Sequence, residues 1–566
     1  MTGKKSKKQG SVKRDGFAKT AIRKVITPFT KFGRKDFYLG IWPCIVTAVI
    51  YFFLNSFNIL WPLAFIFLVP LLLVIEQRQP GIKETFRLFW WAGMLGHIGK
   101  VYWLVYTMEH YGHIPLPLAL LVFLLLVSAL GAFWGAFGAM AYALRKYTNL
   151  PHIVLIPGGW VIMEWWLTWV LSGFPWLPIG NTLIQLLPVV QIADVFGVYA
   201  ISMMALAGNV AVMMIVRFFR KQRNGFPIIE TAVFVALFGA MLVYGLVRIP
   251  QIDKLYAQGK PIRVGLMQGN IDQLVKWRSS HRQSTFDIYR ELSAEAKAKG
   301  AELLIMPETA LPYWQKTDFS FSKRITSFAT KYDAYALVTF PAKVPNDVDS
   351  DDEEERYKKH NAAYLFDPEG NPLGHSFKRK LVPFGEFLPV APVILWLKDA
   401  LRLHEARVSA GFKPAEEYRV IPYPPGGGNF GVAICYEVIF PAIVRKTANL
   451  GTNFMVTITN DSWFGDTSAP HQHVDMVALR SIETRRAFAR AANTGVSCIT
   501  DPAGRVLDAT AVYKRALIVD DIRTMDIRSV YSKIGDLFVY IWLAVFAGFA
   551  VYGIVRARQN KGDGND

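Results

Sequence analysis

The apolar positions of the chain gather into eight long runs, separated by short polar segments and by one long polar block. The runs cover approximately residues 39–55, 59–75, 88–108, 117–144, 153–172, 193–219, 229–248 and 535–555. Helical runs of about 20 apolar residues are long enough to cross a bilayer. The pattern therefore predicts a polytopic α-helical membrane protein, in which seven transmembrane helices precede the polar block and an eighth follows it.

Basic residues flank these runs unevenly and account for much of the formal charge of +19. Residues 1–36 hold twelve Lys and Arg against two acids. The loops 76–87, 145–152 and 220–228 contain Lys or Arg, whereas the loops 56–58, 109–116 and 173–192 contain none. Because basic loops remain in the cytoplasm, the pattern predicts cytoplasmic termini and an extracytoplasmic polar block. No nucleic-acid recognition motif accompanies the charge, so we expect no nucleic-acid partner.

These features divide the chain into four parts. We expect a basic cytoplasmic tail at 1–36, a seven-helix membrane domain at 37–250, an extracytoplasmic domain at 251–530, and the eighth helix with a cytoplasmic C-terminus at 531–566. The tail lacks the short apolar segment and cleavage site of a signal peptide, so we expect it to be retained. An acidic insert at 346–355 is typical of a solvated loop.

Within the polar block the pattern changes to short strands that alternate with helices. The segments "IRVGLMQGN", "AELLIMPET", "AYALVTF", "NAAYLFDPEG", "FGVAICYE" and "NFMVTITND" are short, apolar and bounded by turn residues, which is typical of strands. The segments "SSHRQSTFDIYRELSAEAKAKG" (279–300) and "HVDMVALRSIETRRAFARAAN" (473–493) are predicted helices. This alternation favours a layered α/β domain.

Three of the predicted strands lead into residues that can perform chemistry. Glu308 follows "LLIMP", Lys378 lies in "FKRK", and Cys435 ends "GVAIC". A thiol attacks as the thiolate, and its free pKa of about 8.5 leaves little thiolate at neutral pH. Glu308 could remove the proton, and Lys378 could stabilise the thiolate and an oxyanion. Taken one at a time, each of these residues is more often structural than catalytic.

The other candidates for nucleophile, partner or metal ligand are few. Cys44 and Cys498 lie in apolar segments and are predicted to be small buried hydrophobic residues. His375, His471 and His473 make no obvious pair with Cys435, although spacing alone does not exclude them. The sequence shows no CxxC or Cys/His metal spacing, so we expect no metal and no cofactor.

The segments around these residues together resemble a known family. "MQGNIDQLVKW", "MPETALP", "KRKLVPFGEFLP", "ICYEVIFP", "TNDSWFGDTSAPHQH" and, in the membrane part, "SGFPWLPIGNT" are similar to segments of the apolipoprotein N-acyltransferases, a membrane branch of the carbon–nitrogen hydrolase (nitrilase) superfamily. The similarity covers roughly residues 40–555. It implies a nitrilase-like α-β-β-α sandwich attached to eight transmembrane helices in the cytoplasmic (inner) membrane of a bacterium.

The resemblance also implies roles for individual residues. Glu308 would be the general base, Lys378 the oxyanion-stabilising cation and Cys435 the nucleophile. Substrate-binding or supporting roles fall on Trp277, Asn361, Glu386, Tyr436, Glu437 and Trp463. The implied partners are a phospholipid acyl donor and a diacylated apolipoprotein acceptor. The implied reaction is a ping-pong transfer of the acyl chain through a thioester on Cys435, carried out by a monomeric enzyme.

Two other functions are compatible with the sequence. A hydrolase of the same fold would resolve the acyl-enzyme with water, but a soluble substrate needs no membrane helices. A lipid- or lipoprotein-binding protein without activity would not need Glu308, Lys378 and Cys435 together. The ionisable residues His97, Lys100, Glu164 and Asp194 within the membrane part either line a route for a lipid headgroup or hold helices together.

Overall fold

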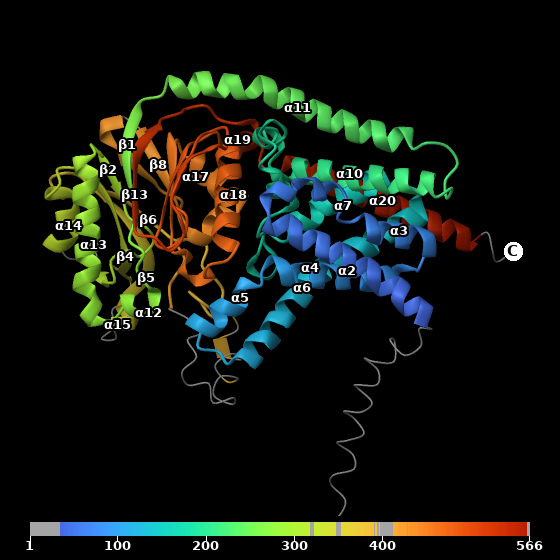
Figure 1. Cartoon of the computed structure of the whole chain (residues 1–566), viewed down its shortest axis with the longest axis horizontal. Helices are drawn as coiled ribbons and strands as arrows, with labels where there is room; N and C mark the ends of the chain where they lie inside the picture. The colour runs from blue at the N-terminus through green and yellow to red at the C-terminus, as the bar shows by residue number, and fades with distance from the viewer. Residues whose placement is uncertain are drawn as a thin grey trace, which may run out of the picture.

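The computed structural model of the chain has two parts, a bundle of helices and a two-sheet domain (Figure 1). The structure describes residues 34–316, 322–346, 353–389, 391–392, 396, 411–426 and 428–562. Most of the basic tail and the centre of the acidic insert lie outside the described residues, so the predictions made for them stay predictions.

Helices form at each of the apolar runs. The bundle contains α2 (Arg34–Ser56), η1 (Asn58–Phe65) with α3 (Val69–Arg78), α4 (Ile82–Lys100), α6 (Leu116–Thr148), α7 (His152–Trp166), α10 (Val198–Phe219), α11 (Ile228–Ala257) and α20 (Leu537–Gly562). Short elements, among them α5 (Trp103–Tyr106), α8 (Leu187–Val190) and α9 (Ala193–Phe196), connect them.

Five helical stretches among the described residues are long and apolar enough to cross a membrane. They are Ile59–Arg78, Leu116–Thr148, Val198–Phe219, Ile228–Ala257 and Leu537–Gln559. The runs at 39–55, 88–108 and 153–172 also contain helices, but these do not meet the same length and composition criteria. α11 carries exposed Ile228, Ile229, Val235 and Val243, an apolar surface that a bilayer would cover. The membrane character is therefore confirmed, whereas the count of eight crossings stays a prediction.

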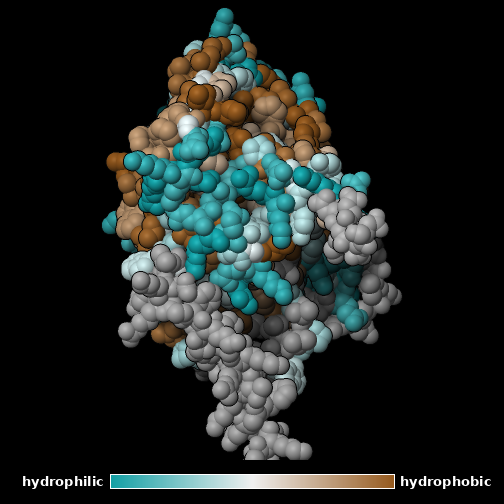
Figure 2. Space-filling model, turned by 90° about the vertical axis from the view of Figure 1, so that its right-hand side faces the viewer, coloured by the Kyte–Doolittle hydropathy of each residue, from teal (hydrophilic) through white to brown (hydrophobic). Residues whose placement is uncertain are grey.

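The loops predicted to face the cytoplasm gather at one end of the bundle. Glu76, beside the first of them, forms ion pairs with Arg145 at 3.4 Å and Arg217 at 2.7 Å, which lie beside the other two. Figure 2 shows this end of the molecule, with a hydrophilic area bordered by hydrophobic surface. The three loops without basic residues lie toward the other end, against the two-sheet domain.

The two-sheet domain is a sandwich. One sheet has the order β13-β1-β2-β4-β5-β6, with β3 beside β4, and the other has the order β12-β11-β10-β9-β8-β7. The first sheet contains β1 (Pro261–Gln268), β2 (Leu303–Ile305), β3 (Gln315–Lys316), β4 (Tyr335–Pro345), β5 (Tyr357–Phe366), β6 (Pro372–Phe377) and β13 (Ala516–Arg523). The second contains β7 (Val420–Tyr423), β8 (Gly428–Ile434), β9 (Phe454–Thr459), β10 (Phe488–Ala492), β11 (Cys498–Thr500) and β12 (Val506–Ala509).

Helices cover the outer face of each sheet, as the strand pattern predicts. Residues of both sheets, such as Val264, Leu303, Phe430 and Val456, form one fully buried core between them. α13 (Ser279–Ala298) and α14 (Lys323–Thr330) pack on the first sheet. α17 (Pro441–Ala448) and α18 (Ala469–Thr484) pack on the second, on the side of the helical bundle (Figure 1). The α-β-β-α sandwich is therefore confirmed.

One predicted element is wrong in its second half. The helix predicted over 473–493 ends at Thr484, and Phe488–Ala492 instead form the strand β10 between β9 and β11. Arg485 adopts a left-handed backbone with φ of 51°, which ends the helix. The Ala- and Arg-rich "RRAFARAAN" favours a helix by intrinsic propensity, but β10 is fully buried and the tertiary pairing of the sheet overrides that preference.

The sandwich is fixed to the bundle by buried charges. Arg485 donates from Nε to Asp194 in α9 at 2.9 Å. Glu483 accepts a hydrogen bond from Val198 N at 2.9 Å, at the first turn of α10, where the helix dipole favours a carboxylate. Asp194, one of the ionisable residues noted in the membrane part, therefore belongs to a joint between the two parts. α11 runs along the side of the bundle and leads into β1 (Figure 1).

Candidate active site

Glu308, Lys378 and Cys435 come from the ends of three strands and meet in one buried cluster. Glu308 follows β2, Lys378 directly follows β6, and Cys435 directly follows β8. Lys378 Nζ lies 2.9 Å from Glu308 Oε1, and both side chains are almost completely buried. Cys435 lies close enough for its thiol to feel the charges of both. The two sheets of the sandwich thus bring together Glu308 and Cys435, which are 127 positions apart in sequence.

The carboxylate of Glu308 is held by three donors. Oε1 accepts from Lys378 Nζ at 2.9 Å and from Asn361 Nδ2 at 2.7 Å, and Oε2 accepts from the backbone N of Asn460 at 3.0 Å. Glu308 is 5% exposed. Donors fixed in this way orient the carboxylate within the cluster. A carboxylate held beside a thiol is placed to accept its proton.

Lys378 is shared between two carboxylates. Its Nζ also lies 2.8 Å from Glu386 Oε1, and Glu386 Oε2 accepts from Val382 N at 2.8 Å. Burial alone would lower the pKa of Lys378, but Glu308 and Glu386 raise that pKa well above its ordinary value. Lys378 is therefore a permanent cation beside the thiol. Burial raises the pKa of Glu386, although Lys378 opposes that effect.

Cys435 occupies a sharp bend between strand and helix. Its φ is +52°, a left-handed conformation that non-glycine residues seldom adopt, and it begins the single 3-10 turn Cys435–Ile439. Burial raises the pKa of its thiol, the charge of Glu308 adds to this, and Lys378 opposes it. The resting thiol is therefore protonated at neutral pH and needs a base before it can attack. α17 begins at Pro441, and the 3-10 turn separates it from the thiol.

Glu437 braces this bend. Its Oε2 accepts from Ile434 N at 2.7 Å, and its Oε1 accepts from the backbone N atoms of Arg379 at 2.6 Å and Lys380 at 3.2 Å. The carboxylate thereby joins the loop after Lys378 to the segment that carries Cys435. The hydroxyl of Tyr436 donates to Gly173 O of the helical bundle at 2.8 Å.

The remaining predicted positions lie around the cluster. Asn361 contacts Glu308 directly and lies 3.4 Å from Glu386 Oε1. Trp277 and Trp314 have ring centroids 6.4 Å apart. Trp463 packs against Tyr111 of the bundle, with ring centroids 4.9 Å apart, and its carbonyl accepts from Thr107 Oγ1 at 2.7 Å. Substrate contact by these residues stays a prediction.

A second buried charge cluster lies behind the thiol and was not predicted. Asp461 pairs with Arg490 at 2.6 Å and contacts His473 Nδ1 at 3.2 Å, and all three side chains are buried. His473 therefore has an acid and an arginine as side-chain partners, and the backbone of Cys435 lies near its ring. The "TND" after the β9 segment is the signal that could have indicated Asp461, and Asn460 beside it.

Lys276 is another residue that the sequence did not single out. Its side chain is 1% exposed, and its Nζ has no hydrogen-bond partner among the described residues. Burial lowers its pKa to about 8, and the carboxylate of Glu308 opposes this. Its position beside Trp277 was the available signal. Within the described part of the chain, no group of three His, Cys, Asp or Glu side chains could hold a metal ion.

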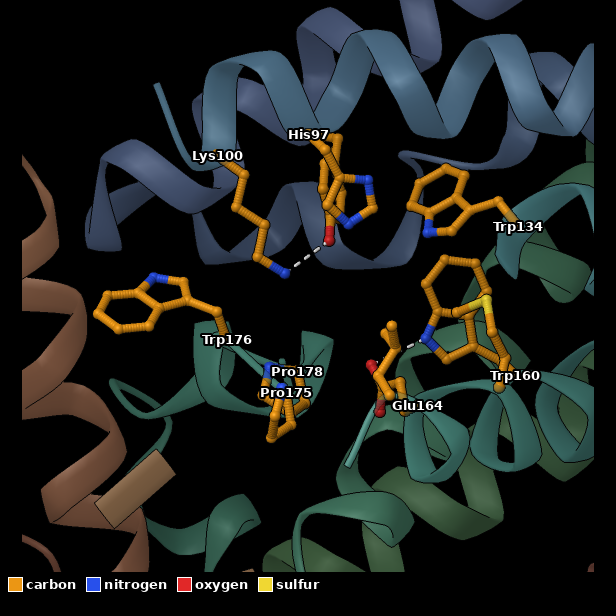
Figure 3. A pocket seen from close by; sticks show the side chains of 11 residues that line it. His97, Lys100, Trp134, Trp160, Glu164, Pro175, Trp176 and Pro178 are labelled. Atoms are coloured by element: carbon orange, nitrogen blue, oxygen red, sulfur yellow. Dashed lines mark hydrogen bonds between the residues drawn. The ribbon is translucent and has the colours of Figure 1, made fainter. Parts of the chain in front are cut away.

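Three of the four ionisable residues noted in the membrane part line one small cavity. His97, Lys100 and Glu164 face it together with aromatic residues such as Trp134 and Trp160 (Figure 3). The cavity has a volume of about 20 Å³. That volume admits one water molecule rather than a lipid headgroup. Asp194 is not among the residues that line it.

Two family models match the two parts of the chain. Residues 40–211 match the family model for the apolipoprotein N-acyltransferase N-terminal domain, and residues 263–531 match the model for carbon–nitrogen hydrolases. The solved structure of Saccharomyces cerevisiae Nit3, a nitrilase-superfamily member, aligns with a TM-score of 0.36 and 17% identity, over 49% of this chain and 93% of that one.

Curated relatives match over most of their length. The apolipoprotein N-acyltransferase of Geobacter metallireducens is 32% identical, over 88% of this chain and 92% of the relative. That of Methylococcus capsulatus is 30% identical, over 88% and 93%, and that of Haemophilus influenzae is 28% identical, over 88% and 92%. The chain belongs to the apolipoprotein N-acyltransferase family of membrane-bound enzymes.

Proposed function

We propose that the chain transfers an acyl chain from a membrane phospholipid to the N-terminal α-amino group of a diacylated apolipoprotein, through a thioester on Cys435. The observation that carries this proposal is the buried Glu308–Lys378 ion pair beside the Cys435 thiol, in a chain of this family. Relatives that carry the acyltransferase name support the type of reaction.

In the first half-reaction Glu308 takes the proton of the Cys435 thiol, which burial keeps protonated at rest. The thiolate attacks the ester carbonyl of the phospholipid, and the oxyanion forms beside the Lys378 ammonium. The ester C–O bond breaks, the proton passes from Glu308 to the leaving oxygen, and a lysophospholipid departs. Proton transfer by a positioned base contributes about 10²–10⁴-fold to such a reaction.

In the second half-reaction the neutral α-amine of the apolipoprotein attacks the thioester. Glu308 accepts a proton from the attacking nitrogen, the C–S bond breaks, and the proton returns to the Cys435 sulfur. The products are an amide and the free enzyme, so the sequence of steps needs no ATP. Asn361 and Glu386 would keep Glu308 and Lys378 in position, and Glu437 and Tyr436 would do the same for the bend at Cys435.

We propose further that eight helices cross the membrane, that residues 251–530 form the catalytic domain on the extracytoplasmic side, and that both termini are cytoplasmic. The clustering of the basic loops at the end remote from the sandwich supports this orientation, because basic loops remain in the cytoplasm. The catalytic cluster then faces the outer surface of the membrane, where the phospholipid and the diacylated apolipoprotein are both present.

Mass spectrometry tests the proposal directly. Purified full-length protein, a synthetic diacylated lipopeptide and phospholipid vesicles should yield a peptide with one additional amide-linked acyl chain. Phospholipid alone should leave a hydroxylamine-labile acyl group on Cys435. Release of free fatty acid without a change in the peptide would instead indicate a hydrolase.

The three cysteines provide matched variants for the same assay. Cys435→Ser should abolish transfer, whereas Cys44→Ser and Cys498→Ser should keep it. Cys44 is buried and donates to the carbonyls of Gly40 and Leu88, and Cys498 is buried within β11, so neither is available to substrate. Full transfer by the Cys435 variant would refute the mechanism.

A further inference from the structure

Residues 173–179, which we call the bridging loop, connect the two parts of the molecule by direct hydrogen bonds. On the side of the sandwich, Gly173 O accepts from the Tyr436 hydroxyl at 2.8 Å, and Trp176 Nε1 donates to Gln472 Oε1 at 2.7 Å. The loop leaves no space for a side chain at its first residue, because a Cβ on Gly173 would meet Thr168 O at 2.2 Å. The loop is thus tightly fixed against the catalytic domain.

On the side of the bundle, two buried charges hold the same loop. Lys100, at the C-terminal end of α4, donates to Leu177 O at 2.7 Å, and Glu164 in α7 accepts from Ile179 N at 2.7 Å. Figure 3 shows Lys100 and Glu164 on opposite sides of the small cavity, with Pro175, Trp176 and Pro178 of the loop along one wall.

The hydrogen bonds of Lys100 and Glu164 go to other groups rather than to each other. Among the described residues, Glu164 Oε2 has no hydrogen-bond partner. Lys100 donates otherwise to the Tyr51 hydroxyl at 2.9 Å, and Glu164 otherwise accepts from Trp160 Nε1 at 2.9 Å. Ionisable side chains are expensive to bury in a membrane part, so the use of two of them on the backbone of one loop indicates a role for that loop.

The catalytic end of this connection is the bend that carries the thiol. The hydroxyl of Tyr436 donates to Gly173 O, and Tyr436 directly follows Cys435. Cys435 itself has the strained φ of +52°. The Trp176 ring also lies 5.7 Å from the ring of His473, behind the thiol. A displacement of the loop would therefore reach Cys435 through the hydrogen bond of Tyr436, the residue next to it.

We propose that Lys100 and Glu164 are positioning residues for Cys435, acting through the bridging loop and Tyr436. The inference rests on the proposed function, since it takes Cys435 as the nucleophile. The membrane domain would then contribute to catalysis as well as anchor the protein. Lys100 and Glu164, on its helices α4 and α7, would keep the bend at Cys435 in the geometry that the attack on the phospholipid ester needs.

The first test measures kcat and KM for acyl transfer by the full-length protein, with functional sites counted by iodoacetamide labelling of Cys435. Lys100→Met and Glu164→Leu should lower kcat per labelled thiol by about 10- to 100-fold with KM for phospholipid within about twofold, because a displacement of 1 Å can cost about 100-fold. Glu164→Gln, whose amide oxygen can still accept from Ile179 N, should restore most of the kcat lost in Glu164→Leu.

A matched control is Glu230→Leu, which removes a carboxylate that pairs with Arg223 at the opposite end of the bundle. It should leave kcat per labelled thiol unchanged. Loss of folded protein in Lys100→Met or Glu164→Leu with an unchanged kcat per labelled thiol would overturn the proposal, because it would indicate a role in folding alone.

The second test is a double-mutant cycle with Tyr436→Phe, which breaks the link to Gly173 by removal of one hydroxyl. If Lys100 acts through the loop, Lys100→Met combined with Tyr436→Phe should lose no more activity than the more damaging single variant. Multiplicative losses would overturn the proposal. Failure of the proposed function would appear differently, as full activity of Cys435→Ser, while the loop variants would leave that result unaffected.

Discussion

The catalytic cluster around Glu308 and the joint around Asp194 both contain a buried carboxylate beside a buried cation. They differ in how many of the cation's N–H groups have a partner. At the joint, Arg485 donates four hydrogen bonds, to Asp194, Gln191 and Pro502 O, and its Nη2 also lies 2.8 Å from Asp194 Oδ2. In the catalytic cluster, Lys378 donates to Glu308 and Glu386 only, among the described residues, and an ammonium has three hydrogens.

We interpret the difference as one between a structural ion pair and the ion pair that the proposed mechanism uses. A fully satisfied arginine has no capacity left for a ligand, so its value lies in fixing one part of the molecule to the other. Lys378 retains a donor beside a thiol, which is what an oxyanion formed at Cys435 would need. Loss of a residue at the joint should therefore reduce stability, and loss of a residue in the catalytic cluster should reduce the reaction rate.

The largest effect is expected for Glu308→Gln. The amide keeps the shape of the side chain but accepts no proton, so the kcat for acyl transfer should fall by about 10²–10⁴-fold. The melting temperature should change little. Rates of product formation by mass spectrometry, at equal concentrations of folded protein, provide the measurement.

The matched control for this variant is Glu291→Gln, at an exposed carboxylate on α13 that pairs with Arg515 at 2.6 Å. It should retain full activity. A Glu308→Gln enzyme within threefold of the parent would remove Glu308 from the role of base and would weaken the distinction drawn between the two clusters.

The next effect is expected for Arg485→Met, on stability. Removal of the Arg485 guanidinium leaves Asp194 buried, with Arg248 at 3.0 Å as the remaining cation. Breaking a buried ion pair in this way lowers the free energy of unfolding by about 3–5 kcal/mol. Thermal unfolding of the detergent-solubilised protein should therefore begin at a clearly lower temperature. The kcat of the molecules that remain folded should stay within about twofold of the parent. An unchanged melting temperature together with a large loss of kcat would reverse the assignment.

Most of the sandwich was predictable from local patterns, because its strands are short, apolar and bounded by turns. The end of α18 was not, since "RRAFARAAN" prefers a helix locally and becomes β10 only through pairing with β9 and β11. Arg490, in that strand, is fully buried and pairs with Asp461, which begins the 3-10 turn after β9. Long-range pairs of this kind leave no local pattern in a single sequence.

The candidate site was predictable to a different degree. Glu308, Lys378 and Cys435 were identified mainly by the resemblance, since each alone has an ordinary structural explanation. The structure adds the donors that fix them, such as Asn460 N, which no side-chain motif can indicate. The contacts of Lys100 and Glu164 with the bridging loop were equally hidden, because their partners there are backbone atoms.

A smaller effect, dependent on pH, is expected for Lys276→Met. Burial lowers the pKa of Lys276 from 10.5 to about 8, so the folded protein bears the cost of the buried charge below pH 8. Between pH 8 and pH 10.5 the folded protein loses this proton before the unfolded chain does, and the stability of the parent rises. The variant should therefore melt a few degrees above the parent at pH 7, at about 2–4 °C for each kcal/mol.

The difference between the two melting temperatures should close as the pH approaches 10.5. Lys297→Met, at a lysine whose side chain is 41% exposed, should show no such dependence. A difference in melting temperature that stays constant across the pH range would mean that a group other than Glu308 balances the charge of Lys276. Lys276 would then resemble Arg485 at the joint.

The smallest effect is expected for Lys299→Ala, at an ion pair that belongs to neither cluster. Lys299 Nζ lies 2.7 Å from Glu295 Oε1 one helical turn away, closer than Lys378 lies to Glu308, but both side chains are 52% exposed. Water screens such a pair, and its contribution to stability is about 0.3–0.5 kcal/mol. The melting temperature should fall by no more than about 1–2 °C, and 0.5 M salt should remove most of that difference. A larger loss would show that distance, rather than burial, decides what an ion pair contributes in this protein.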